Sequence, residues 1–149
     1  MDGRTEGANV AHVAEPDYHR LLMVRTRLRE FEHWSAEQAR EQGLTAAQHQ
    51  LLLAVRGHPG PDGPTIRDVA GYLLVRHHTA VELVDRTQEL GLLERRRDAA
   101  DHRMIRLALT RTGRTRLARL SAAHVEELRE LTAMIEDLTR DLRAPTRSR

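Results

Sequence analysis

The chain of 149 residues contains no cysteine and no lysine, because all 24 of its basic residues are arginine. The absence of cysteine excludes disulfides, thiolate catalysis, cysteine-ligated zinc and thiol redox sensing. The absence of lysine excludes Schiff-base chemistry and the lysine of a phosphate-binding P-loop. The longest apolar runs, such as 51–55, are too short to span a membrane, and the first 16 residues lack the apolar stretch of a secretory signal. We therefore expect a soluble, cytoplasmic protein.

The motifs of common enzymes are also missing. The sequence contains no G-x-S-x-G, no glycine-rich phosphate loop and no recognisable pair of catalytic carboxylates. Its nine histidines show neither H-x3-H nor H-E-x-x-H spacing, so no metal site is predicted. We expect no catalytic residues and no cofactor, and a hydrolase is the least favoured class.

Charge is distributed unevenly along the chain, although the formal net charge is only +2. Residues 1–50 carry six arginines and eight acidic residues, a net charge of −2. Residues 95–119 carry nine arginines and two acidic residues, a net charge of +7. A near-neutral average with one strongly basic segment indicates a local surface that binds a polyanion.

Most of the chain is predicted to be helical. Apolar residues at spacings of three and four predict a first helix over 17–42, which opens at Pro16 and stops before Gly43. The segment 45–48, TAAQ, is a capping box that starts a second helix ending at Gly57. The segment 57–64 includes three prolines and three glycines and forms a loop.

Two shorter helices follow this loop. Thr65, with Asp68 three residues later, caps a helix over 66–73. A turn over 74–76 leads to a helix over about 77–90, which Gly91 ends.

The most informative segment is 93–112, which reads as a two-stranded β-ribbon. Strand residues at 92–93 and 104–109 flank a tip at 98–103 that carries paired acidic residues and an arginine. A single basic hairpin attached to several short helices is typical of a winged helix, which usually binds duplex DNA.

Thr110 caps a last long helix that we expect to run to about residue 143. Apolar residues and one histidine recur along it at heptad-like spacing from Leu117 to Leu142. This seam either packs on the first helix of the same chain or forms, with that helix, an interface between two copies, which we favour. The residues predicted to form the dimer interface are Tyr18, Leu21, Leu22, Leu128, Leu131, Ile135, Leu138 and Leu142.

The order of these elements resembles the MarR family of bacterial transcriptional regulators. LTAAQ at 44–48 resembles the opening of the family's second helix, and TIRDVA at 65–70 resembles the helix before the recognition helix. HTAVELVDR at 78–86, followed by GL at 91–92, resembles the recognition helix itself. D-x-x-D-x-R at 98–103, leading to LT-x-x-G at 109–113, resembles the wing and the start of the dimerisation helix. The match covers roughly residues 17–135.

The resemblance implies a mainly α fold with a small β-ribbon, in a single domain over 1–149. Its expected parts are a winged helix-turn-helix over 45–110, dimerisation helices over 17–42 and 111–143, and flexible tails over 1–14 and 144–149. It also implies a ligand-responsive homodimeric repressor that binds double-stranded DNA at a pseudo-palindromic operator. The alternative is an architectural or protein-binding winged helix without operator specificity, and steep salt dependence with preference for one palindrome would separate the two.

We expect the helix over 77–90 to enter the major groove and the ribbon to contact the backbone and the minor groove. The predicted DNA-binding residues are Thr65, Arg76, His77, His78, Thr79, Glu82, Arg86, Arg95, Arg97, Asp101 and Arg103. Arg95 and Arg97 point to one side of their strand and Arg96 to the other, so only one set can face the backbone.

Several of these residues have a plainer interpretation. The two histidines could be exposed capping residues, and Arg103 could belong to a solvated turn. Glu82 or Asp85 could accept a hydrogen bond from cytosine, but we favour pairing of these acids with an arginine of the same helix. By resemblance, Asp101 orients the wing through pairing with a nearby arginine.

His33, Trp34 and His49 are the aromatic and imidazole groups nearest the junction of the first two helices. The resemblance implies that a small effector, often a phenolic or aromatic acid, binds between the dimerisation helices and the winged helix. A tryptophan beside histidines would suit an aromatic or anionic ligand. The alternative is that Trp34 is an ordinary core residue.

Overall fold

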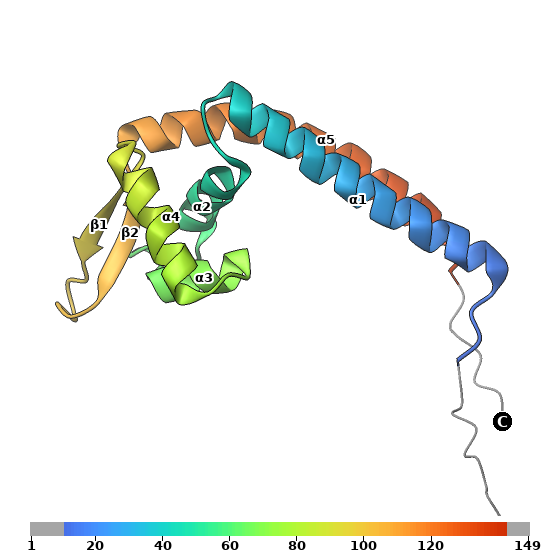
Figure 1. Cartoon of the computed structure of the whole chain (residues 1–149), viewed down its shortest axis with the longest axis horizontal. Helices are drawn as coiled ribbons and strands as arrows, with labels where there is room; N and C mark the ends of the chain where they lie inside the picture. The colour runs from blue at the N-terminus through green and yellow to red at the C-terminus, as the bar shows by residue number, and fades with distance from the viewer. Residues whose placement is uncertain (1–10, 143–149) are drawn as a thin grey trace, which may run out of the picture. The chain divides into compact units, whose positions relative to one another are not determined.

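The computed structural model describes residues 11–142. Along the chain it contains α1 (Glu15–Glu41), α2 (Ala46–Gly57), α3 (Ile66–Leu73), α4 (His77–Glu89), β1 (Leu93–Arg97), β2 (Ile105–Leu109) and α5 (Arg111–Thr139) (Figure 1). The predicted class, mainly α with a small β-ribbon, is confirmed.

The chain divides into two compact units. Unit 1 comprises residues 1–32 and 127–149, of which 11–32 and 127–142 are described. Unit 2 comprises His33–Glu126 and contains α2, α3, α4 and the hairpin. Both α1 and α5 contribute one part to each unit.

The helices of unit 2 begin where side chains replace missing backbone hydrogen bonds. The backbone N–H of Gln48 donates to Thr45 Oγ1 at 3.1 Å, and the N–H of Thr45 donates to Gln48 Oε1 at 3.0 Å. Thr65 and Asp68 form the same reciprocal pair at the start of α3, at 2.9 and 3.2 Å. Each box satisfies two of the four N–H groups left free at a helix start, so both predicted starts are confirmed.

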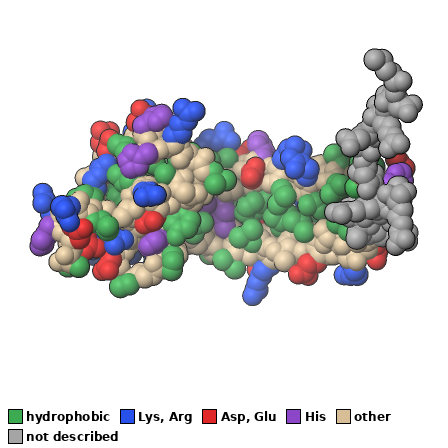
Figure 2. Space-filling view, turned by 90° about the horizontal axis from the view of Figure 1, so that it is seen from below, with side chains coloured by type: hydrophobic (Ala, Val, Ile, Leu, Met, Phe, Trp, Pro, Cys, Tyr) green, Lys and Arg blue, Asp and Glu red, His purple; other side chains and the backbone are tan. Residues whose placement is uncertain are grey.

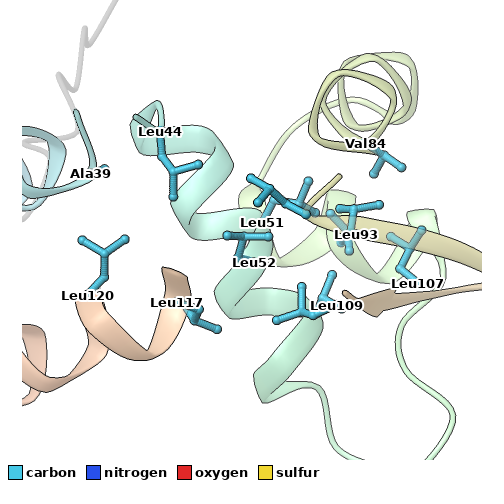
Figure 3. Close-up of a cluster of buried hydrophobic side chains, with 13 residues drawn as sticks. Ala39, Leu44, Leu51, Leu52, Val84, Leu93, Leu107, Leu109, Leu117 and Leu120 are labelled. Atoms are coloured by element: carbon cyan, nitrogen blue, oxygen red, sulfur yellow. The ribbon is translucent and has the colours of Figure 1, made fainter. Parts of the chain in front are cut away.

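The core of unit 2 is built on α2. Leu51 and Leu52 pack in one cluster with Val84 of α4 and the hairpin residues Leu93 and Leu107, and all five side chains are fully buried (Figure 3). Further buried apolar side chains come from α1, the α1–α2 turn, β2 and α5: Ala39, Leu44, Leu109, Leu117 and Leu120. This packing fixes α4 and the hairpin on one scaffold.

The hairpin is antiparallel, with Leu93 opposite Leu109 and Arg97 opposite Ile105. The predicted two-stranded ribbon is confirmed, and β1 includes Arg95, Arg96 and Arg97, which were expected on its first strand. Leu93 is buried, and exposure increases along β1 toward Arg97.

Two glycines allow neighbouring segments to reach the hairpin backbone. A Cβ at Gly63, which has φ of +77°, would overlap the carbonyl oxygen of Leu107, and one at Gly113 would overlap that of Leu92. Beside Gly63, the Leu107 N–H donates to the Pro64 carbonyl at 2.8 Å. The loop before α3 and the first turn of α5 are therefore held directly against the base of the hairpin.

Gly113→Ala is expected to lower the free energy of unfolding by about 1–3 kcal/mol, because the new methyl group forces backbone to move in a packed core. Gly71→Ala is the matched control, since its Cβ would meet open space on α3. That control should instead stabilise the helix by about 0.5–1 kcal/mol. Denaturant unfolding measures both, and equal stability of Gly113→Ala and the parent protein would contradict the close approach.

Unit 1 pairs the beginning of α1 with the end of α5, which run side by side (Figure 1). Arg20 Nη1 donates to the buried carboxylate of Asp17 at 2.8 Å, and Arg20 Nη2 lies 3.9 Å from Asp141 of the other segment. The expectation that the last helix reaches residue 143 is wrong, because α5 ends at Thr139. The Leu142 N–H donates to the Thr139 carbonyl at 3.1 Å, which closes a tighter turn after the helix. The apolar spacing in the sequence includes Leu142 and therefore extends beyond the last helical residue.

Apolar side chains remain on the surface of unit 1. Figure 2 shows hydrophobic side chains gathered along the part formed by these two helices. The large exposed apolar residues of this unit are Tyr18, Leu21, Leu22, Leu28, Leu128 and Met134. Leu131, Ile135 and Leu138, also predicted for the interface, are partly buried.

Candidate nucleic-acid interface

The helix α4 has one buried face and one exposed face. Ala80, Val84 and Thr87 are buried and Leu83 is partly buried, as the sequence predicted. Residues 77–79 are exposed in the first turn. The side chains at the start of α4 are therefore free to reach an outside partner.

The backbone at the start of α4 is also open. Its N-cap residue, Arg76, makes no side-chain capping bond, in contrast to Thr45 and Thr65 at the starts of α2 and α3. Free N–H groups and the positive end of the helix dipole favour a phosphate oxygen. The first turn of α4 thus offers both side-chain and backbone donors.

The hairpin tip is organised by Asp98, a residue to which the sequence interpretation gave no role of its own. Its Oδ1 accepts from the N–H groups of Ala100 and Asp101 at 2.8 and 2.9 Å. Its Oδ2 accepts from Nε of Arg106 at 2.9 Å, and Arg106 Nη1 donates to the carbonyl of Gly63 at 3.2 Å. These hydrogen bonds, first that from Asp101, hold the pKa of Asp98 below its usual value.

Arg103 projects from this ordered tip. Its side chain is 93% exposed, and its Nε lies 3.3 Å from Oδ1 of Asp101. This is the pairing that the resemblance implied for Asp101, but an ion pair so exposed contributes little to stability. In Figure 1 the tip and the start of α4 lie at the same lower end of unit 2. A duplex approaching this end can therefore meet both elements.

Arg95 has a structural partner. Its Nη2 donates to Oδ1 of Asp85 at 2.5 Å, and its Nη1 donates to Gln88 Oε1. The expected pairing of Asp85 with an arginine of its own helix is therefore wrong, because the hairpin brings Arg95 closer. Within residues 11–142 Glu82 and Arg86 form no ion pair, so the same expectation fails for them. The Arg95 contact ties α4 to β1.

The remaining predicted DNA-binding residues are divided between roles. Arg76, Glu82, Arg86 and Arg97 are exposed. Thr65 is occupied as the cap of α3, where its hydroxyl also donates to Asp68 at 3.0 Å.

Leu74 lies in the predicted turn between α3 and α4, but the sequence analysis gave its side chain no role. Its side chain is 92% exposed, and its backbone is left-handed with φ of 54°. A non-glycine residue in this conformation stores backbone strain of roughly 1 kcal/mol or more. It places an apolar side chain at the turn that precedes the open end of α4.

Two of the three residues predicted to bind an effector are brought together in unit 2. The rings of Trp34 and His49 lie 4.7 and 4.6 Å from that of His124, between ring centroids. His124, which the sequence placed only in the apolar seam, is therefore the centre of the cluster. His33 lies apart, 74% exposed, with its Nε2 3.3 Å from Glu37.

Hydrogen bonds fix the orientation of His124. Its Nδ1 lies 2.8 Å from the Leu120 carbonyl, which can only accept, so Nδ1 carries the proton. In the neutral ring, Nε2 then accepts from the Ser35 hydroxyl at 2.8 Å. Burial, with the neighbouring His124, lowers the pKa of His49. His49 is therefore neutral near pH 7.

The described residues offer neither a metal site nor a membrane span. Among residues 11–142 no group of three or more histidines or acidic residues is arranged to hold a metal ion. No helix in the same range has the length and apolar character needed to cross a bilayer.

Known proteins share this geometry. Residues 42–104 match the sequence model of the MarR family. The chain is similar to AbsC, a MarR family transcriptional regulator from Streptomyces coelicolor, with 19% identity over 88% of this chain and 90% of that chain and a TM-score of 0.69. A search of curated proteins finds no significant match.

Two further solved structures are similar. The complex of S. aureus MepR with DNA has 20% identity, covers 83% of this chain and 85% of that chain, and gives a TM-score of 0.62. A mutant of MarR from E. coli has 22% identity, with 82% and 83% coverage and a TM-score of 0.59. The fold is therefore that of a winged-helix protein. The resemblance to the MarR family is confirmed, and the chain has the fold of MarR-type DNA-binding transcriptional regulators.

Proposed function

We propose that the chain is a sequence-specific transcriptional regulator that binds double-stranded DNA as a homodimer. The observation that carries this proposal is the combination, in unit 2, of an open first turn of α4 and an ordered tip that projects Arg103. His77, His78 and Thr79 supply groups for the major groove, and Arg103 suits the narrower minor groove. The MepR–DNA complex among the similar structures supports a duplex as the ligand.

A dimer is the second part of the proposal. Tyr18, Leu21 and Leu22 on α1 and Leu128 on α5 are exposed in the single chain. Contiguous apolar surface of this kind commonly marks an interface between proteins. A second copy that covers unit 1, together with the partly buried Leu131, Ile135 and Leu138, would remove this surface from water, and Leu142 extends the same seam.

The third part is regulation by a small effector that relieves repression. The cluster of Trp34, His49 and His124 supports an aromatic ligand, because it brings an indole ring and two imidazole rings together. His33 lies outside this cluster and would take part only through a separate surface.

A footprint on the DNA that flanks the gene tests the first two parts. We expect protection of two half-sites with a dyad, in successive major grooves about 34–36 Å apart. Binding should weaken steeply as salt rises and should favour that palindrome over scrambled DNA. A footprint on one half-site without a dyad contradicts the dimer, and equal binding to all sequences indicates an architectural module instead.

A further inference from the structure

A pocket of about 300 Å³ lies in unit 2 beside the hairpin. It is bounded by the end of α2, the loop over 58–63, the end of β2 and the first turn of α5. Three arginines from three different elements line it: Arg56, Arg96 and Arg114. None of them belongs to the surface described above for DNA.

The charges of this pocket are not balanced within the chain. In the described part, no carboxylate or other acceptor pairs with the guanidinium groups of Arg56 and Arg114. Arg96 shares its charge with Glu94, to which its Nε donates at 2.7 Å. Asp62 is the acidic residue among those that line the pocket. The lining therefore carries net positive charge that an anion would neutralise.

The side chains that line the pocket and its volume indicate which kind of anion it would bind. A guanidinium presents a planar fork of N–H donors that matches a carboxylate or phosphate group. Val55, Leu107 and Leu109 add apolar walls beside the arginines. The volume is at the small end of the range of ligand pockets. We propose that this pocket binds a small organic anion, with its carboxylate or phosphate held by Arg56 and Arg114 and a short apolar body against the leucines.

The direct test is an amide NMR titration of the full chain with benzoate and phenyl phosphate. Benzamide serves as the matched neutral probe, because it has the shape of benzoate without the charge. We expect both anions to shift the amide signals of residues 56–63 and 107–114 in a saturable way, and benzamide to shift them far less. Equal shifts with benzamide, or shifts confined to other residues, would overturn the proposal.

Substitution of the two unpaired pocket arginines tests whether their charges bind the anion. Arg56→Gln and Arg114→Gln should each raise the Kd for phenyl phosphate by about 10- to 100-fold, the range for loss of a charged hydrogen bond. Arg119→Gln on the exposed side of α5 is the matched control and should leave the Kd unchanged, because Arg119 is outside the pocket. Arg56 and Arg114 are exposed and make no ion pair within residues 11–142, so these variants should keep their thermal stability.

A phosphate of the DNA backbone is the other anion that these arginines could bind, and the same variants distinguish it from a small organic anion. If the pocket serves a small anion, Arg56→Gln and Arg114→Gln leave duplex affinity and its salt slope close to those of the parent protein. If both variants weaken duplex binding and reduce the slope, while phenyl phosphate binds as before, the pocket is part of the DNA interface and the proposal is wrong. The titration does not depend on operator binding, so its failure is separable from failure of the proposed regulator.

Discussion

Leu22→Glu is expected to turn the protein into a folded monomer. Leu22 lies on α1 and is 59% exposed in the single chain, so a carboxylate there meets water and leaves the core of either unit intact. In a dimer that buries this face, the same carboxylate would lose its hydration without a partner. The variant therefore separates the stability of the chain from the stability of the dimer.

The expected size of this effect follows from symmetry. In a two-fold interface each residue occurs twice, so one substitution removes two buried leucines. Burying a leucine side chain contributes about 1.5–3 kcal/mol, which gives about 3–6 kcal/mol for the pair. The Kd of dimerisation should rise by more than about 100-fold. Operator affinity should fall with it, because a monomer binds only one half-site.

Sedimentation over a range of concentrations and thermal unfolding together check this expectation. Leu128→Glu on α5 should give the same result as Leu22→Glu, since its side chain is also exposed. Glu130→Arg, an exposed charge change on the opposite side of α5, is the control and should remain a dimer. A parent protein that sediments as a folded monomer at micromolar concentration would refute the dimer outright.

Local signals in the sequence were sufficient for the order and the starts of the helices. Thr45 with Gln48 and Thr65 with Asp68 act within one turn, so their capping depends on residues that are adjacent in sequence. Thr110 is a further example, because its hydroxyl accepts from the Gly113 N–H at 3.1 Å. Such interactions are predictable because no distant residue has to be placed first.

The interactions that shape the candidate DNA surface are not local, and sequence patterns missed them. Arg106 donates hydrogen bonds to Asp98 across the hairpin and to the carbonyl of Gly63, which lies in the loop before α3. Arg95 crosses to Asp85 on α4, although each acid of that helix had an arginine nearby in sequence. Register decides these partners, and register follows from the packing of the hairpin on α2.

His124 and Leu74 were missed for different reasons. His124 fits the heptad spacing of α5, so the pattern gave no sign that its ring meets those of Trp34 and His49. Leu74 adopts a backbone conformation that leucine rarely takes, and no propensity argument predicts it. Both positions lie in regions with a proposed role, where local preference commonly yields to function.

The hairpin tip and α4 are expected to contribute differently to DNA binding, and single substitutions in each should show this difference. Arg103→Ala should weaken binding to operator and to unrelated duplex alike, because a turn tip reads charge and groove shape and presents no surface for the major-groove pattern. The slope of log K against log salt should fall by about one unit for each phosphate that the side chain no longer neutralises. Arg129→Ala, an exposed arginine of unit 1, is the charge control and should change neither quantity.

His77→Ala and His78→Ala should behave differently, because their side chains lie in the exposed first turn of α4. Removing a hydrogen bond to a base should cost about 1–3 kcal/mol at each half-site of the operator, with a smaller change on random DNA. The ratio of the two affinities therefore falls, while the salt slope stays nearly constant. Fluorescence anisotropy with operator and scrambled duplexes at several salt concentrations measures both properties for all three variants. If Arg103→Ala abolished discrimination and both histidine variants preserved it, α4 would not be the element that reads the sequence.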